Sequence, residues 1–153
     1  MIIYDEIKKY ENQPIRIYVD MDGVVADYEV GVAADYDKKR PLISNISKLE
    51  KISKMPNVEL YILSVTKMSR GTQEKNDWLD QFAPFFKKEN RNILSREENN
   101  FEKSALHLKY EFISSLKRDD SQIIFIDDDP AILRKIADDF DDIVLLKDTT
   151  LVD

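Results

Sequence analysis

The sequence predicts an α/β protein in which helices cover both faces of a central parallel sheet, an α/β/α sandwich of three layers. Five short runs rich in Ile, Val, Tyr or Leu are separated by segments with helical periodicity. The second and fourth runs are almost continuously apolar, as in strands that are buried on both faces. Strands that alternate with helices form βαβ units with right-handed crossovers. A length of 153 residues suits one domain, so we expect residues 1–153 to form a single unit.

The five predicted strands are short, and four of them end at polar residues. The first (IRIYVD) and the fourth (QIIFID) end at an aspartate, and the second (VELYILS) and the third (NILS) end at a serine. β-branched and aromatic residues are frequent in these runs, which suits a pleated sheet. The strands are expected at residues 15–20, 58–64, 92–95, 122–127 and 143–146.

Apolar residues spaced by three or four positions predict the helices between the strands. The first of these helices is stopped by Pro56, and the second follows Thr72, which we expect to be its N-cap. The last begins at Asp129-Pro130, because aspartate is a good N-cap and proline suits the first helical position. The four apolar stripes are Leu42, Ile46, Leu49 and Ile52; Trp78, Leu79 and Phe82; Leu106, Phe112, Ile113 and Leu116; and Leu133, Ile136, Ala137 and Phe140.

Residues 1–14 precede the first strand as an N-terminal extension, and the sequence leaves open whether they form a helix or a loose arm. They contain no basic lead followed by a long apolar stretch, which argues against a signal peptide. No apolar run of the chain approaches the ~18–20 residues that a membrane span needs. We therefore expect a cytoplasmic protein with no membrane partner.

The composition excludes several kinds of functional site. The chain has 23 Lys and Arg, 30 Asp and Glu, one His and no Cys, and its net charge is −7. Without Cys there is no disulfide, Cys-ligated zinc, iron–sulfur cluster or thiol nucleophile. A single His argues against a His-based catalytic triad and a multi-His metal site. The negative charge gives no electrostatic drive toward nucleic acid or anionic lipid.

The acidic residues gather where ligands bind in an open parallel sheet, just outside the carboxyl ends of the strands. Asp20 and Asp22 follow the first strand, Ser64 ends the second, and Asp127 and Asp128 follow the fourth. Clustered carboxylates repel one another unless a cation joins them, and all-oxygen ligands favour a hard cation such as Mg²⁺. The two acidic ends meet only if strands one and four are neighbours, which predicts the strand order 3-2-1-4-5.

These residues also suit phosphoryl chemistry. Gly23 indicates that the chain turns after Asp20, so one carboxylate can reach a phosphorus atom while Asp22 lies beside the leaving oxygen. A carboxylate nucleophile can form an aspartyl-phosphate, and a second carboxyl group can protonate the leaving alcohol and then activate water. Ser64 can donate a hydrogen bond to the phosphoryl oxygens, and a lysine can balance their charge.

The motifs DxDGVxxD, hhhS, a downstream Lys and hhhDD, in this order, resemble the haloacid dehalogenase superfamily of phosphotransferases. The resemblance extends from Ile15 to about Leu146, and VDMDGVVADY, YILS and FIDD are similar to deoxyribonucleotidase-like members. It implies a Rossmann-like core and a Mg²⁺-dependent reaction. The roles that it implies are Asp20 as nucleophile, Asp22 as general acid/base, Ser64 as phosphate ligand, Met21 and Gly23 as phosphate-binding turn residues, and Asp20, Asp22 (through its backbone carbonyl), Asp127 and Asp128 as metal ligands.

Two departures from this pattern concern a lysine and the cap. We place the catalytic and phosphate-binding lysine of the third motif at Lys109, just before a helix, and Lys103 competes with it. Many relatives carry a cap domain between the first two motifs, whereas residues 28–57 form only a short insert here. The resemblance therefore implies a capless or minimally capped member, which leaves its substrate specificity open.

The sequence thus predicts a phosphomonoester hydrolase acting on a small phosphorylated substrate, with a nucleotide suggested by resemblance alone. The alternatives are a polynucleotide-end phosphatase, for which the chain has no obvious basic track, and a non-catalytic metal- or phosphate-binding regulator. A receiver-like phospho-switch is disfavoured because the third strand ends in Ser95-Arg96 rather than in a lone aspartate. The aromatic residues between 78 and 86 suit either the core or a homo-oligomer surface.

Overall fold

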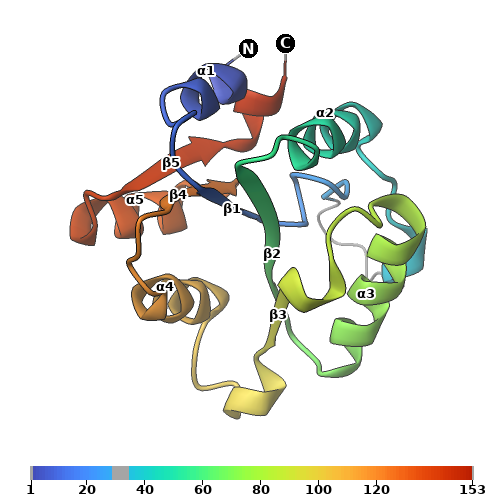
Figure 1. The fold of residues 1–153 in the computed structure, drawn as a ribbon. Coiled ribbons are helices and arrows are strands. Elements are labelled where there is room, and N and C mark those ends of the chain that lie inside the picture. The colour runs from blue at the N-terminus through green and yellow to red at the C-terminus, as the bar shows by residue number, and fades with distance from the viewer. Residues whose placement is uncertain (1, 29–34, 153) are drawn as a thin grey trace.

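The computed structural model describes residues 2–28 and 35–152, and its centre is one parallel five-stranded sheet (Figure 1). The strand order is β3-β2-β1-β4-β5, as the sequence predicts. The strands are β1 Ile15–Val19, β2 Val58–Thr66, β3 Arg91–Ser95, β4 Gln122–Asp127 and β5 Ile143–Lys147. The helices are α1 Ile2–Lys8, α2 Ile43–Ser53, α3 Arg70–Phe82, α4 Ala105–Ser115 and α5 Pro130–Asp139.

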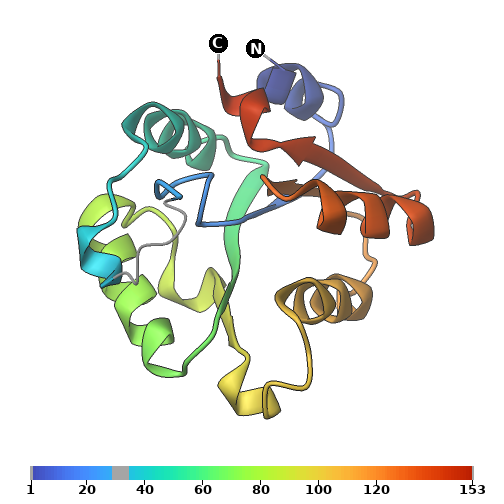
Figure 2. The ribbon, with the colours of Figure 1, turned by 180° about the vertical axis from the view of Figure 1, so that it is seen from behind.

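The helices form two layers, one on each face of the sheet, because side chains alternate along each strand. Ile15, Ile17 and Val19 of β1 lie in one core with buried residues of α1, α2 and α3. Tyr18 points to the other face and packs in a second core with Ile113 of α4 and buried residues of α5. Figures 1 and 2 show α4 and α5 on one side of the sheet and α2 and α3 on the other. The predicted three-layer α/β architecture is confirmed.

The register of β1 against β4 brings the ends of these two strands together. Val19 pairs with Ile126, and the Asp20 N–H donates to the Ile126 carbonyl at 3.0 Å. The residue after β1 therefore lies beside Asp127, the last residue of β4. On the other side Val19 pairs with Ile62 of β2, two residues before Ser64. The strand order thus positions the three polar strand ends at one edge of the sheet.

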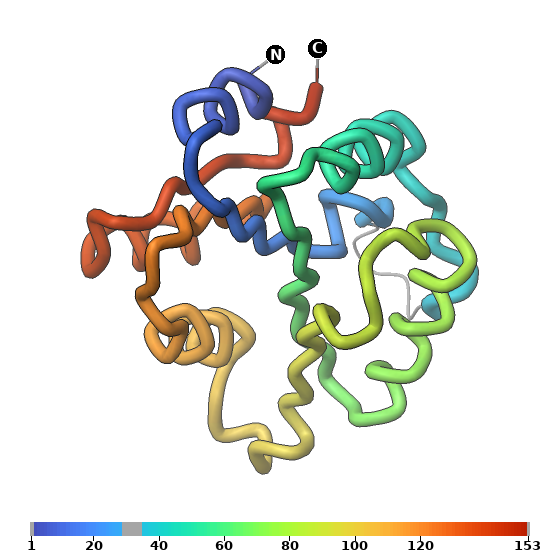
Figure 3. Tube along the Cα trace, in the orientation of Figure 1, coloured from blue at the N-terminus to red at the C-terminus, as the bar shows by residue number. Residues whose placement is uncertain are grey.

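The N-terminal extension contains a helix, α1, that packs on the core. Ile3 and Ile7 of α1 are buried, and α1 contacts the short 3-10 helix η4 (Asp148–Leu151) near the other end of the chain. Figure 3 traces these two segments at the same end of the molecule.

The segment between β1 and β2 holds the 3-10 helix η1 (Tyr36–Lys38) and α2, while residues 29–34 of the insert lie outside the described part. The Asn45 amide of α2 donates to the Val24 carbonyl at 2.8 Å, which ties this helix to the turn after β1. One prediction in the next helix was wrong. Helix α3 begins at Arg70 after Ser69, so Thr72 lies inside it and is not its N-cap.

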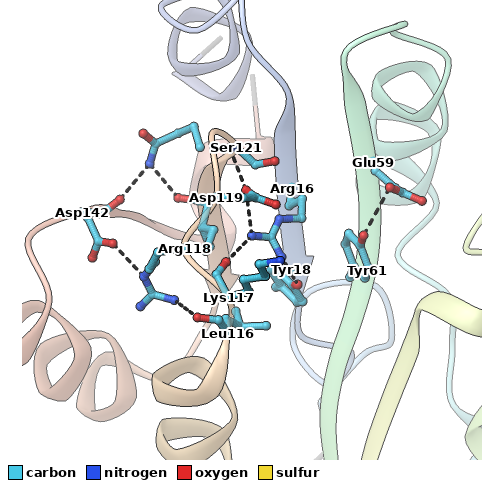
Figure 4. A network of polar contacts seen from close by, with 12 residues as sticks. Arg16, Tyr18, Glu59, Tyr61, Leu116, Lys117, Arg118, Asp119, Ser121 and Asp142 are labelled. Atoms are coloured by element: carbon cyan, nitrogen blue, oxygen red, sulfur yellow. Dashed lines mark hydrogen bonds and ion pairs between the residues drawn. The ribbon is translucent and has the colours of Figure 1, made fainter.

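Arg16 ties the opposite edge of the sheet together, where the strands begin (Figure 4). Its Nη2 donates to the Lys117 carbonyl at 2.7 Å and lies 3.3 Å from Asp119 Oδ1. These two contacts hold the connection between α4 and β4 against β1. The rings of Tyr18 and Tyr61 stack beside it, with centroids 4.6 Å apart. No described helix has the length and apolar character that crossing a bilayer requires.

Candidate functional site

The chain turns sharply after β1, and this turn sets the direction of the side chains that follow. The Met21 carbonyl accepts hydrogen bonds from the backbone N–H groups of residues 24–26 at 2.9–3.1 Å. Gly23 has a φ of +82°, in the left-handed region that favours glycine, and its N–H donates to the Ala26 carbonyl at 2.8 Å. The Met21 side chain is fully buried in the core. Asp20 and Asp22 therefore leave the turn in different directions and have different partners.

Asp20, Asp127 and Asp128 form a group of carboxylates that could hold a metal ion. One oxygen from each residue lies within 4.8 Å of the others. Asp127 is fully buried, Asp20 is 6% exposed, and Asp128 is half-buried. The side chain of Asp22 is outside this group, and the sequence assigned only the backbone carbonyl of Asp22 to the metal. The three aspartates come from the ends of β1 and β4, as the predicted strand order requires.

Lys109 of α4 lies between two of these carboxylates. Its Nζ is 2.6 Å from Asp127 Oδ2 and 3.0 Å from Asp20 Oδ1, and the residue is buried. The sequence placed Lys109 just before a helix, which was wrong, because it lies in the middle of α4. Lys103, the competing candidate, pairs instead with Glu111 at 2.8 Å, and both side chains of this pair are substantially exposed.

The charges of the acidic group are not balanced. Burial raises the pKa of Asp20 well above its usual range, and the neighbouring Asp127 adds to the effect while Lys109 opposes it. Burial, followed by Asp127, raises the pKa of Asp128 to about 6. Although burial disfavours its charge, Lys109 has a raised pKa because Asp20 and Asp127 stabilise the ammonium. Three carboxylates facing one ammonium make an arrangement that a divalent cation would neutralise.

The end of β4 is shaped by its own aspartates. Asp127 Oδ1 accepts the Asp129 N–H at 2.9 Å, and Asp129 Oδ1 accepts the Ala131 N–H at 2.9 Å. Asp129 is therefore the N-cap of α5, as predicted, with Pro130 at its first position. The carboxylate of Asp128 lies over Gly23, so the turn after β1 and the end of β4 are in direct contact.

The Asp22 carboxylate is surrounded by donors. Oδ1 accepts from the Tyr36 hydroxyl at 2.8 Å and from Lys39 Nζ at 2.7 Å, and Oδ2 lies 3.4 Å from Lys75 Nζ. Burial raises the pKa of Asp22, but the Lys75 charge and the hydrogen bonds from Lys39 and Tyr36 outweigh burial, so the pKa lies below its usual range. Asp22 is thus held in its ionised form.

Ser64 lies at the same edge of the sheet and is buried. Its Oγ accepts a hydrogen bond from Lys75 Nζ at 2.6 Å. Lys75 therefore connects the serine at the end of β2 with Asp22 of the turn after β1. The sequence prediction named both of these residues but not the lysine between them.

Sequence reasoning missed Tyr36 and Lys75, and it did not foresee that Lys39 contacts Asp22. Lys75 lies one helical turn before Trp78 in α3. The apolar stripe of this helix predicts contacts with the core but gives no sign that the lysine is buried. The Trp78 indole N–H donates to the Lys39 carbonyl at 3.0 Å, and its ring packs against Tyr36 with centroids 5.9 Å apart. The one available signal was the Lys38-Lys39-Arg40 run in the insert, close in sequence to the first motif.

A cavity of about 450 Å³ opens at the acidic group. The exposed Tyr28 is one of its lining residues, and the others are Asp20, Asp22, Val65, Ala105, Lys109 and Asp127–Asp129. A larger cavity of about 870 Å³ lies at the other edge of the sheet, where strands such as β1 and β2 begin. It contains none of the candidate catalytic residues, so we assign the chemistry to the smaller cavity.

In comparisons with known proteins, no protein-family model matches the chain and no curated protein matches it at a significant level. What is established about this chain therefore comes from its structure. It has a parallel sheet of order 3-2-1-4-5, and the buried acidic group after β1 and β4 could bind a metal ion.

Proposed function

We propose that this chain is a Mg²⁺-dependent phosphomonoester hydrolase of the haloacid dehalogenase type, which works through an aspartyl-phosphate on Asp20. One observation carries the proposal. The ammonium of Lys109 bridges Asp20 and Asp127, and Asp128 completes a group of three carboxylates beside it. A lone metal-binding loop would not need a buried lysine against two of its ligands, whereas phosphoryl transfer needs both a cation and a lysine around the reacting group.

The donor set fits Mg²⁺. Asp20, Asp127 and Asp128 offer only oxygen ligands, and Mg²⁺ takes few protein carboxylates and completes its coordination with water and substrate phosphate. The backbone carbonyl of Asp22 would be a further ligand by the resemblance of the sequence motifs. When bound, the ion would polarise the phosphoryl oxygens and offset the negative charge of the acidic group.

In the first step an oxygen of Asp20 attacks the phosphorus atom, the bond to the ester oxygen breaks, and Asp22 gives that oxygen a proton. In the second step Asp22 takes a proton from water, the water oxygen attacks the phosphorus atom, and phosphate leaves Asp20. The donors around Asp22 favour the ionised form that the second step needs. An incoming phosphate carries negative charge, which favours the protonated form for the first step.

The remaining residues would bind the phosphoryl group. Lys109 lines the cavity as a donor, the buried Ser64 comes directly before the lining residue Val65, and the backbone of Met21 and Gly23 forms the turn that follows Asp20. The Gly23 N–H is already bonded to Ala26, so the Met21 N–H is the better candidate donor of the two. We propose a small phosphate ester such as a nucleotide as substrate, since a cavity of about 450 Å³ suits a molecule of that size.

The test is a panel of phosphomonoesters, including deoxynucleotides and a 3′-phosphorylated oligonucleotide, assayed with and without Mg²⁺. Asp20→Asn should lose turnover by roughly 10³-fold or more, because it removes the nucleophile. The control is Asp138→Asn, which changes an exposed aspartate in the last turn of α5. Full hydrolysis by Asp20→Asn would refute the nucleophile assignment.

The same panel separates the alternatives. Preference for the oligonucleotide would favour the polynucleotide-end phosphatase. Binding of Mg²⁺ and phosphate without hydrolysis of any ester would favour a non-catalytic binding protein.

A further inference from the structure

Lys75 is a buried lysine that the reaction above does not use. It lies on α3 with only 4% of its side chain exposed. Its ammonium donates to Ser64 Oγ at 2.6 Å and to the Val65 carbonyl at 3.0 Å, and it lies 3.4 Å from Asp22 Oδ2. These three acceptors account for the three N–H groups of an ammonium. The ammonium also lies 5.3 Å from the centroid of the Tyr36 ring.

The bond to Lys75 fixes the direction in which Ser64 can donate. An ammonium has no lone pair, so Lys75 is the donor and Ser64 Oγ the acceptor in this bond. Ser64 Oγ has no other hydrogen-bond partner among residues 2–28 and 35–152. Its own O–H must therefore point away from Lys75, in a direction where no described residue accepts it.

The charges around Asp22 and around the acidic group also favour a phosphoryl group on the Ser64 side. On one side two ammonium groups, Lys39 and Lys75, face the single carboxylate of Asp22. On the other side one ammonium, Lys109, lies within the group of three carboxylates. The Ser64 side thus carries an excess of positive charge and the acidic side an excess of negative charge. Phosphoryl oxygens are favoured on the first side and a cation on the second.

We propose that Lys75 is a positioning residue of this site, which holds the Ser64 hydroxyl as a hydrogen-bond donor to a phosphoryl oxygen. The inference rests on the proposed function, because it takes a phosphoryl group to be bound beside Asp20. Lys75 acts through Ser64 and does not itself need to touch the substrate. A buried ammonium is costly where packing alone is needed, and an apolar side chain of similar length would fill the same space.

The test is a double-mutant cycle on the affinity for inorganic phosphate, measured by calorimetry in the presence of Mg²⁺. Lys75→Met should weaken phosphate binding by about tenfold in the parent protein, since it removes a buried charge-assisted hydrogen bond. In the Ser64→Ala background the penalty of the same change should be smaller by roughly threefold or more, because the hydroxyl that Lys75 directs is gone. The ratio of these two losses of affinity distinguishes two explanations. If Lys75 acts by orienting the Ser64 hydroxyl, the loss is smaller without that hydroxyl, whereas the loss of a positive charge alone has the same effect in both backgrounds.

Two further variants keep the result interpretable. Lys135→Met removes an exposed lysine of α5, and it should leave phosphate affinity unchanged. Lys75→Arg keeps the charge and a donor, and it should recover part of the affinity even if Lys75→Met is too unstable to measure. Equal penalties in both backgrounds, or unchanged affinity in Lys75→Met, would overturn the proposal.

Failure of the proposed function would look different. If the parent protein binds phosphate but hydrolyses no ester, the catalytic proposal fails, and the cycle still decides the role of Lys75. If the parent protein binds no phosphate with Mg²⁺ present, both proposals are overturned.

Discussion

The carboxylate of Asp128 covers Gly23 so closely that a Cβ atom on this glycine would lie 1.9 Å from Asp128 Oδ2. The turn after β1 and the end of β4 therefore meet at a point where no side chain fits. Two features of this position require glycine. One is the close contact with Asp128, and the other is the φ of +82°, which lies in the left-handed region. This contact makes the position of Asp128 depend on the backbone of the first motif.

We expect Gly23→Ala to damage the acidic group. The left-handed backbone alone costs about 1–2 kcal/mol for a residue with a Cβ atom, and the clash must move Asp128. Stability should fall, and Mg²⁺ affinity should fall by about tenfold or more, as for other changes that displace metal ligands. Denaturant unfolding and a calorimetric Mg²⁺ titration measure the two effects.

Gly71→Ala is the matched control for this glycine. A Cβ atom there would also lie 1.9 Å from an oxygen, the Oγ1 of Thr66, but this contact is away from the acidic group. Its stability can fall, yet its Mg²⁺ affinity should match that of the parent protein. Equal loss of Mg²⁺ affinity in both variants would contradict the link between Gly23 and the acidic group.

Lys109→Met should destabilise the metal-free protein by roughly 3–5 kcal/mol, because it leaves the buried carboxylates of Asp20 and Asp127 without their cation. Added Mg²⁺ should restore more stability to this variant than to the parent protein, since the ion replaces part of the missing charge. Turnover should be lost even with Mg²⁺ bound. Thermal unfolding with EDTA or with Mg²⁺, together with an ester assay, tests these expectations.

Lys103→Met distinguishes the two candidate lysines. It breaks an exposed ion pair with Glu111, which solvent screens and which therefore contributes little to stability. Its turnover should stay close to that of the parent protein. A larger loss of turnover in Lys103→Met than in Lys109→Met would exchange the two roles.

The sequence was sufficient to predict the sheet and the acidic end of β4. Continuous apolar runs ending in polar residues define strands, and strand order followed from requiring Asp20 and Asp127 to meet, which the pairing of Val19 with Ile126 confirms. The N-cap at Asp129 was also predictable, because capping depends on local chemistry alone.

The donors around Asp22 could not be predicted in the same way. Tyr36, Lys39 and Lys75 belong to segments that reach the site only through tertiary packing, which no local pattern records. A single sequence does not distinguish a surface lysine from a lysine in a site. Lys75 is buried on the same helix as Trp78 and Leu79, but only the two apolar residues are expected to be buried from their type. The error at Thr72 has a similar origin, since several polar residues near a helix start can serve as the cap.

The stability of the metal-free protein should depend on the ionisation of Asp128. Burial and Asp127 raise its pKa from 3.8 to about 6, so the folded state binds this proton more tightly than the unfolded state. Stability from this group is present below about pH 4 and is lost as the pH rises through about 6. Asp128 is half-buried, so solvent screening should limit the effect to about 1 kcal/mol.

Asp128→Asn isolates this dependence because asparagine does not titrate. With EDTA present, the stability of the parent protein relative to Asp128→Asn should fall between about pH 4 and pH 7. With Mg²⁺ present the trend should reverse, because the ion binds the ionised carboxylate. Urea unfolding at several pH values measures both trends. If the free energies of unfolding of the two proteins change in parallel with pH in the absence of metal, the pKa of Asp128 is not raised.

The indole of Trp78 should matter for turnover and not for metal binding. Trp78→Phe removes the donor to the Lys39 carbonyl, which anchors the segment whose Lys39 and Tyr36 side chains hold Asp22. Loss of this part-buried hydrogen bond should cost about 1 kcal/mol of stability. We expect a reduced kcat on a phosphate ester and an unchanged Mg²⁺ affinity, because Asp20, Asp127 and Asp128 lie outside this contact.

Phe82→Leu provides the comparison on the same helix. The Phe82 ring packs against Trp78 with centroids 4.9 Å apart and has no hydrogen bond to lose. Its stability should fall by an amount similar to that of Trp78→Phe, since it truncates a partly buried aromatic residue, while kcat should be retained. If kcat falls in proportion to stability in both variants, the indole bond has no specific role. If kcat falls only in Trp78→Phe, the short insert between β1 and β2 sets the position of Asp22.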